Sequence, residues 1–168
     1  DADEDGYASS SPAAGVEPGN DCDDTNPDTY MGAAWNDDSG QCMTDVDGDG
    51  YGELSPAAGV AEGSDCDDSD EHAYPGAAEL EDAEACLTDA DGDGFGSDAA
   101  GNPGTDCDDT DPDAYPDAAY RDDPEACMRD VDGDDFGDSS PAAGVEAGTD
   151  CNDNRSWQTP QDFDGDGF

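Results

Sequence analysis

The amino-acid sequence predicts an irregular fold, mostly coil and turn, with little regular secondary structure. Three observations predict it: a composition too acidic for a large core, an acidic motif that returns along the chain, and a regular spacing of cysteines. Together they indicate short tandem repeats that disulfide bonds staple closed, because no repeat of this length has enough apolar residues to fold by burial alone.

The composition is strongly acidic. The 168 residues include 49 Asp and Glu but only three Arg and no Lys, so the formal net charge is -46. Hydrophobic residues make up 32% of the chain, and such a composition is by itself typical of disordered proteins. The negative charge argues against nucleic acid and anionic membrane surfaces as partners. No apolar run is long enough for membrane insertion.

An acidic motif recurs in a register that a disordered polyanion has no reason to keep. Asp1–Tyr7 reads Asp-Ala-Asp-Glu-Asp-Gly-Tyr, and related segments begin at Asp45, Asp89, Asp130 and Asp162. A second motif, Asp-Cys-Asp/Asn-Asp, follows each of the first four copies. The predicted organisation is repeat 1 at 1–44, repeat 2 at 45–88, repeat 3 at 89–129, a divergent repeat 4 at 130–161 and the start of a fifth at 162–168.

The first motif has the ligand spacing of a calcium loop. Carboxylates at loop positions 1, 3 and 5, a glycine for the bend at position 6 and a backbone carbonyl at position 7 supply hard oxygen ligands, which suit Ca²⁺ better than zinc or copper. An EF-hand would have a bidentate Glu at position 12, where this chain has Pro12, Pro56, Ala100 or Pro141. The predicted ligands of this motif are Asp1, Asp3, Asp5, Tyr7, Asp45, Asp47, Asp49, Tyr51, Asp89, Asp91, Asp93, Phe95, Asp130, Asp132, Asp134, Phe136, Asp162, Asp164 and Asp166.

The second motif is expected to donate the missing carboxylates and to open another acidic loop. Asp109 begins an Asp-x-Asp-x-Asp-x-Tyr pattern, which Asn26 and His72 alter in repeats 1 and 2. Up to two metal ions per repeat are therefore expected, the second site being best formed in repeats 1 and 3; the alternative is solvated acidic turns. The predicted ligands of this motif are Asp21, Asp23, Asp24, Asn26, Asp28, Asp65, Asp67, Asp68, Asp70, Asp106, Asp108, Asp109, Asp111, Asp113, Asp150 and Asp153.

The cysteines predict one disulfide in each of the first three repeats. Pairing across 20 residues gives Cys22–Cys42, Cys66–Cys86 and Cys107–Cys127. The alternative pairs neighbouring repeats as Cys42–Cys66, Cys86–Cys107 and Cys127–Cys151, and either scheme leaves one cysteine over. Disulfides indicate an oxidising compartment, so an extracellular or cell-surface protein is expected.

The few apolar residues are expected to form one small cluster per repeat. Its members are the position-7 aromatics, a tyrosine of the second loop, the residue after the second cysteine and a linker valine. They are Tyr7, Tyr51, Phe95, Phe136, Tyr30, Tyr74, Tyr115, Met43, Leu87, Met128, Val16, Val60 and Val145. Helix is expected only as a turn or two near Glu79–Cys86, where Ala, Glu and Leu are concentrated.

The combined motif resembles a known family. Asp65–Ala77 and Asp106–Ala118, each preceded by an Asp-x-Asp-Gly-Asp-Gly-aromatic loop, resemble the metal-binding-motif repeats of the MopE type, found in secreted bacterial proteins. The layout is also similar to thrombospondin type 3 repeats, in which acidic loops wrap a string of calcium ions. The resemblance implies calcium-caged repeats, several Ca²⁺ per chain and a bacterial, extracellular location. Some MopE-type proteins bind copper through histidine and a modified tryptophan, but Trp35 and Trp157 lie outside any shared register.

Two classes of function follow from the sequence. The first is an extracellular structural protein, a stalk, adhesin segment or filament subunit that calcium makes rigid. The alternative is an ion-sequestering or mineral-nucleating polyanion, with a copper-binding surface protein less favoured. An enzyme is not expected, because no nucleophile–base pair is evident. Further expected partners are copies of the chain itself, joined head to tail through the incomplete loop at 162–168 and the unmatched cysteine, and O-glycans on the Ser-rich linkers.

Overall fold

The structure is a computed structural model that describes residues 1–158 and 160. The chain divides into two compact units, an N-terminal unit at Asp1–Pro75 and a C-terminal unit at Gly76–Phe168. This division does not follow the repeat boundaries given above, which stay a prediction.

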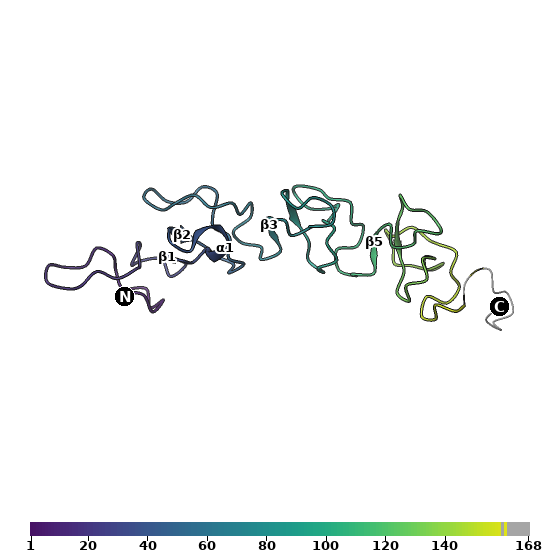
Figure 1. Ribbon diagram of the computed structural model, residues 1–168, viewed down its shortest axis with the longest axis horizontal. Helices are drawn as coiled ribbons and strands as arrows, with labels where there is room; N and C mark the ends of the chain where they lie inside the picture. The colour runs from purple at the N-terminus through teal and green to yellow at the C-terminus, as the bar shows by residue number, and fades with distance from the viewer. Residues whose placement is uncertain (159, 161–168) are drawn as a thin grey trace. The chain divides into compact units, whose positions relative to one another are not determined.

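Regular secondary structure is sparse among the described residues (Figure 1). The N-terminal unit contains β1 (Thr29–Met31), α1 (Trp35–Asp38), β2 (Cys42–Thr44) and β3 (Ala73–Pro75). The C-terminal unit contains β4 (Cys86–Thr88), β5 (Ala114–Pro116) and β6 (Cys127–Arg129). Turns, bends and coil make up the remainder of the described chain. The predicted irregular fold is thereby confirmed.

Two short hairpins share one register. Strand β1 pairs antiparallel with β2, Tyr30 lying opposite Met43. Strand β5 pairs with β6 in the same way, and Tyr115 lies opposite Met128. Each hairpin follows a second motif directly, so the second loop of the repeat ends in a strand whose partner begins at the second cysteine.

Disulfides close the segment between the second motif and its hairpin. Cys22 bonds to Cys42 and Cys107 to Cys127, with Cα atoms 6.3 and 6.0 Å apart. Cys66 and Cys86 are also disulfide-bonded, and Cys151 is free and exposed. The pairing across 20 residues is therefore confirmed in repeats 1 and 3. The alternative pairing across repeats is wrong, because Cys42 and Cys127 bond within their own repeats.

Packing relies on small side chains and on stacked rings. Tyr7 stacks on Tyr30 with ring centroids 4.3 Å apart, and the same stacking joins Tyr51 to Tyr74 and Phe95 to Tyr115. The residues after the second cysteines are buried, as predicted: Met43, Leu87 and Met128. Alanines beside the hairpins are buried too, and the sequence did not single them out: Ala33, Ala34, Ala73, Ala78, Ala114 and Ala119. Because Val16 is 62% exposed, its predicted place in the core is wrong.

The helix predicted near Glu79–Cys86 is also wrong, since residues 79–85 form turns and bends and Cys86 begins β4. The backbone N–H groups of Leu80 and Glu81 both donate to the carbonyl of Gly94, at 3.0 and 3.3 Å. One helical-type bond forms here, from the N–H of Asp82 to the carbonyl of Ala78 at 3.0 Å, and a single such bond does not establish a helix. The described helix lies instead at Trp35–Asp38, where one short turn forms.

Candidate metal centre

In repeats 2 to 4, the first aspartate of the loop fixes the turn. In repeat 2, Asp45 Oδ1 accepts the N–H of Gly48 at 2.8 Å, and Oδ2 accepts the N–H of Gly50 at 3.1 Å. Asp89 and Asp130 accept the same two backbone donors in repeats 3 and 4. Each oxygen keeps a lone pair after accepting one hydrogen bond, so the residue can close the turn and still face a cation.

Apart from Asp132, the aspartates at positions 3 and 5 each commit one oxygen to the backbone two residues on. Asp47 Oδ1 accepts the N–H of Asp49 at 3.2 Å, and Asp49 Oδ1 accepts the N–H of Tyr51 at 2.7 Å. The same bonds form at Asp3, Asp5, Asp91, Asp93 and Asp134. Such local bonds favour turns over helix or strand and hold the second oxygen in a fixed direction.

The second motif brings its first aspartate against the loop. Parallel bridges join Glu53 to Asp65, and the equivalent residues in the other three described copies. The contact is close: a Cβ on Gly63 would lie 2.1 Å from the carbonyl oxygen of Gly52, so glycine is needed there. The four aspartates that this contact places are at most 1% exposed: Asp21, Asp65, Asp106 and Asp150.

Three carboxylates in each of the four described copies carry a buried oxygen without a hydrogen-bond partner. They are the aspartates at positions 3 and 5 and the first aspartate of the second motif: Asp3, Asp5, Asp21, Asp47, Asp49, Asp65, Asp91, Asp93, Asp106, Asp132, Asp134 and Asp150. A buried carboxylate oxygen without a donor is costly. A cation among these oxygens would satisfy all three, so the residues present fit a hard metal ion.

A fourth carboxylate is held beside each loop by a backbone donor. The N–H of Val46 reaches Asp68 Oδ1 at 3.2 Å, and the residue at loop position 2 makes the same bond to Asp24, Asp109 and Asp153. One ligand oxygen each from Asp3, Asp21 and Asp24 lie within 4.8 Å of one another. The second motif therefore contributes its first and last acidic residues.

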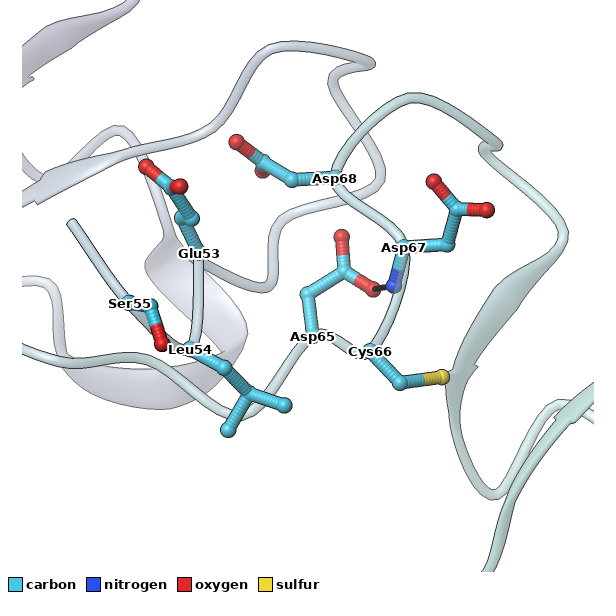
Figure 2. Close-up of a pocket in the computed structure, with 7 residues that line it drawn as sticks. All are labelled: Glu53, Leu54, Ser55, Asp65, Cys66, Asp67 and Asp68. Carbon is cyan, nitrogen blue, oxygen red and sulfur yellow. Dashed lines mark hydrogen bonds between the residues drawn. The ribbon is translucent and has the colours of Figure 1, made fainter.

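Figure 2 shows how these side chains lie in repeat 2. Asp65 directs one oxygen to the N–H of Asp67 and the other into the space between Asp68 and Glu53, which line the same pocket. The predicted ligand Asp67 points away from that space, and its Oδ1 accepts the hydroxyl of Ser69. Glu53 was not predicted, because it belongs to neither motif and only the bridge to Asp65 brings it near.

In repeats 1 to 3, the cysteine of the second motif adds no ligand. Cys66 lines the pocket but is disulfide-bonded, as is Cys107 beside Asp106. A disulfide sulfur is not a thiolate, and thiolates are the form in which cysteine binds metals. The donor set is thus oxygen throughout, which is the set that Ca²⁺ and Mg²⁺ prefer.

Burial raises the pKa of several of these carboxyls. In repeat 2 it raises the pKa of Asp49 and Asp65 to about 6 and that of Asp68 to about 7, and neighbouring aspartates add to the effect. In repeat 3 the pKa of Asp93 rises to about 6 and that of Asp106 to about 7, again chiefly through burial. Positive charge at these clusters is favoured, whether as protons or as a metal ion.

The second acidic loop is organised differently. Asn26, Asp70 and Asp111 each accept the N–H of the residue two positions on, and no buried unpartnered oxygen is found on them in the described part of the chain. In repeat 3 the guanidinium of Arg129 contacts Asp111 at 2.5 Å and Asp153 at 2.8 Å. A protein cation therefore already neutralises part of this loop, and a second metal ion per repeat stays a prediction.

Three further sets of predicted ligands remain: those of repeat 4, the residues at loop position 7, and those of the fifth copy. Repeat 4 keeps its three buried carboxylates although Asp135 replaces the glycine at position 6, where it adopts a φ of 70°. At position 7, the aromatic residues donate their N–H to the position-5 aspartate. Asp162, Asp164 and Asp166 lie outside the described residues.

Comparisons with models of protein families, with curated proteins and with solved structures find no match for this chain. Among the described residues, no helix is long and apolar enough to cross a membrane.

Proposed function

We propose that this chain is an extracellular calcium-binding structural protein whose tandem repeats fold around Ca²⁺ ions. The observation that carries the proposal is the set of three buried, unpartnered carboxylate oxygens, repeated at equivalent residues of four copies. Acidic clusters on a protein surface are ordinarily solvated. Solvation does not explain twelve aspartates that each bury an unpartnered oxygen at the same motif positions.

Calcium is the ion that fits best. The donors are carboxylates in a loop built from turns, and Ca²⁺ accepts six to eight oxygens in flexible geometry, whereas Mg²⁺ demands a near-ideal octahedron. Disulfide bonds favour an oxidising, extracellular compartment, where calcium is abundant. Extracellular modules of this kind bind calcium with dissociation constants of roughly 10⁻⁴ to 10⁻³ M.

A structural role follows from the small apolar core of the repeats. Their core is a few stacked rings and alanines, so metal binding itself supplies folding free energy. Calcium would also neutralise part of a formal net charge of -46, which otherwise opposes compaction. The resemblance to MopE-type and thrombospondin type 3 repeats supports the same proposal. A calcium-rigidified stalk, adhesin segment or filament subunit would use these properties directly.

An ion-sequestering polyanion is the second candidate, and the third residues of the second motifs favour it. Asp67 points to solvent, and Asp23 and Asp108, like Asp67, accept only a neighbouring hydroxyl at Oδ1. Such groups bind cations weakly without ordering the chain. The two candidates differ in whether calcium binding changes the conformation, and that difference can be measured.

The deciding experiment is size-exclusion chromatography with light scattering under non-reducing conditions. The chain is run in EGTA, in millimolar CaCl₂, in MgCl₂ and in NaCl of matched ionic strength. We expect calcium to reduce the hydrodynamic radius at constant mass, well beyond the effect of sodium. A rise in mass with calcium would indicate head-to-tail assembly of the folded chain. If calcium contracts the chain no more than sodium does, the structural proposal fails and the sequestering candidate replaces it.

A further inference from the structure

A carboxylate outside both metal-binding motifs holds the next cation site together. In the N-terminal unit this is Asp37 of α1. Its Oδ2 accepts the N–H of Gly52 and the N–H of Ser64, both at 2.9 Å, while its Oδ1 accepts the hydroxyl of Ser64 at 2.6 Å. One side chain of repeat 1 therefore bonds two segments of repeat 2 that are 12 residues apart in sequence.

The same arrangement recurs twice in the C-terminal unit. Glu81 Oε2 accepts the N–H groups of Gly96 and Thr105, both at 3.1 Å. Asp122 Oδ2 accepts those of Gly137 at 3.0 Å and Thr149 at 2.7 Å, and its Oδ1 accepts the hydroxyl of Thr149. The acid is Asp in two copies and Glu in one, so the position requires a carboxylate that reaches both donors rather than one side-chain length.

The two N–H donors lie next to the two segments that form the site, the first-motif loop and the second motif. Gly52 follows Tyr51, the last residue of the first-motif loop, and Ser64 precedes Asp65, the buried aspartate of the second motif. A carboxylate bound to both fixes the separation between the loop and Asp65. Its oxygens are not among the buried, unpartnered ones of the site, so it orients the ligands rather than supplying one.

A backbone bond anchors the same turn on the same loop. The N–H of Asn36, adjacent to Asp37, donates to the carbonyl of Gly50 at 2.8 Å. The equivalent N–H groups of Leu80 and Arg121 donate to Gly94 and Asp135 at 3.0 and 2.9 Å. The turn of one repeat is thus docked on the position-6 residue of the next, and the carboxylate beside it closes the contact.

We propose that Asp37, Glu81 and Asp122 are positioning residues for the cation site of the following repeat, so that each repeat preorganises the site of its successor. This inference rests on the proposed function, because it assumes that the loops bind calcium. Groups that orient metal ligands typically change metal affinity by about 10- to 100-fold when they are removed. The effect is expected at the following site and not at the site of the same repeat.

The test follows calcium binding at single loops by NMR of the full ¹⁵N-labelled chain. Gly50 reports on the site of repeat 2, and Gly6 in the same spectra reports on that of repeat 1. Asp37→Ala is compared with Asp38→Ala, which removes the same charge from the next residue. Asp38 is an exposed aspartate whose Oδ1 accepts the local N–H of Gly40 and whose Oδ2 accepts, weakly, the side-chain amide of Gln41. Asp37→Glu supplies the carboxylate that repeat 2 uses naturally at Glu81.

We expect Asp37→Ala to weaken calcium binding at Gly50 by about 10- to 100-fold while Gly6 titrates as in the wild type. Asp38→Ala should leave both titrations nearly unchanged, and Asp37→Glu should restore most of the lost affinity. Asp37→Asn keeps an acceptor but loses the charge, so it should give a smaller loss, again confined to Gly50.

Distinct results overturn the inference and the proposed function. If the wild type binds calcium and Asp37→Ala matches Asp38→Ala at Gly50, the positioning role is wrong and the calcium sites remain. If Asp37→Ala and Asp37→Asn weaken Gly6 and Gly50 equally, the role is general stability and the inference fails as well. If neither glycine of the wild type responds to calcium, both the inference and the proposed function fall.

Discussion

Asp65 shows how one side chain serves both the fold and the site. Its Oδ1 accepts the N–H of Asp67 at 2.9 Å and so shapes the turn of the second motif, while its Oδ2 has no partner and faces the pocket between Glu53 and Asp68. Only 1% of the residue is exposed. The charge that would bind a cation is therefore the charge that opposes folding when no cation is bound.

This double role predicts opposite effects of Asp65→Asn with and without calcium. The variant should bind calcium at least about tenfold more weakly in repeat 2, because it loses a charged ligand. In EGTA it should be more compact than the wild type, since a buried negative charge has been removed. Calcium titration calorimetry and hydrodynamic radius in EGTA measure the two effects. Asp67→Asn, at an exposed carboxylate, is the matched control, and equal behaviour of the two variants would contradict the prediction.

The raised pKa values predict an unusual pH dependence of the metal-free chain. Burial raises the folded pKa of Asp49 and Asp65 to about 6 and that of Asp68 to about 7, whereas the pKa of an unfolded aspartate is 3.8. A folded pKa above the unfolded one means that folding is favoured at low pH, and that this stabilisation is lost as the pH rises through the folded pKa. In EGTA, the chain should therefore expand between about pH 5 and pH 8.

Calcium should abolish that expansion, because it replaces the protons at the same oxygens. The measurement is the hydrodynamic radius across this pH range, in EGTA and in calcium. Ordinary exposed carboxyls would produce a transition near pH 4, so a midpoint between about 6 and 7 identifies the buried groups. A radius in EGTA that does not change above pH 5 would rule out the proposed origin of the effect.

At the scale of the element, each loop is a turn whose glycines differ in what surrounds them. Gly48 and Gly50 both have positive φ, at 87° and 95°. A Cβ on Gly48 would meet nothing within 4 Å, whereas one on Gly50 would lie 2.6 Å from Cε2 of Trp35. Glu4 occupies the Gly48 position in repeat 1, also at positive φ, so that position tolerates a side chain.

Gly50→Ala should therefore destabilise the protein more than Gly48→Ala. Left-handed backbone costs about 1–2 kcal/mol for a residue with a Cβ, and this applies to both variants. The Trp35 ring, which is 55% exposed, would have to turn aside, and this should add about 0.5–1.5 kcal/mol at Gly50 alone. Urea unfolding in saturating calcium measures the difference. Equal losses of stability would show that α1 does not hold the loop as the structure places it.

The loops also show which residues of the candidate site a sequence of this kind can predict. Asp47, Asp49 and Asp65 were predicted as ligands because their spacing is periodic, and the structure turns an oxygen of each inward. Glu53 and Asp37 were missed, because neither lies in a motif and their roles come from contacts with residues 12 to 27 positions away. Asp67 points away from the pocket, which its motif does not reveal, and its predicted role as a ligand stays a prediction.

At the scale of the whole molecule, the three disulfides leave one thiol. Cys151 is exposed, and its place in the second motif is the one that Cys22 and Cys107 use for disulfides. We expect one alkylated thiol per native chain by mass spectrometry, and slow formation of a disulfide-linked dimer in air that Cys151→Ser prevents. No alkylation of the native chain, or a dimer that persists in the variant, would contradict this.

The sequence by itself determined the motif register, the acidic character of the loops, the irregular fold and the cysteine spacing, because each depends on residue type and on distances of a few positions along the chain. It left open whether Cys42 bonds to Cys22 or to Cys66, and it placed a helix at Glu79–Cys86 that does not form.

Only the tertiary structure decided which oxygens are buried without a donor, that Arg129 neutralises Asp111, and that Asp37 ties together two segments of the following repeat. The physical reason is that burial and donor assignment depend on which distant segments meet. In this chain, those contacts are hydrogen bonds from backbone N–H groups. Every residue but proline carries such a group, so no sequence motif reveals which of them will donate.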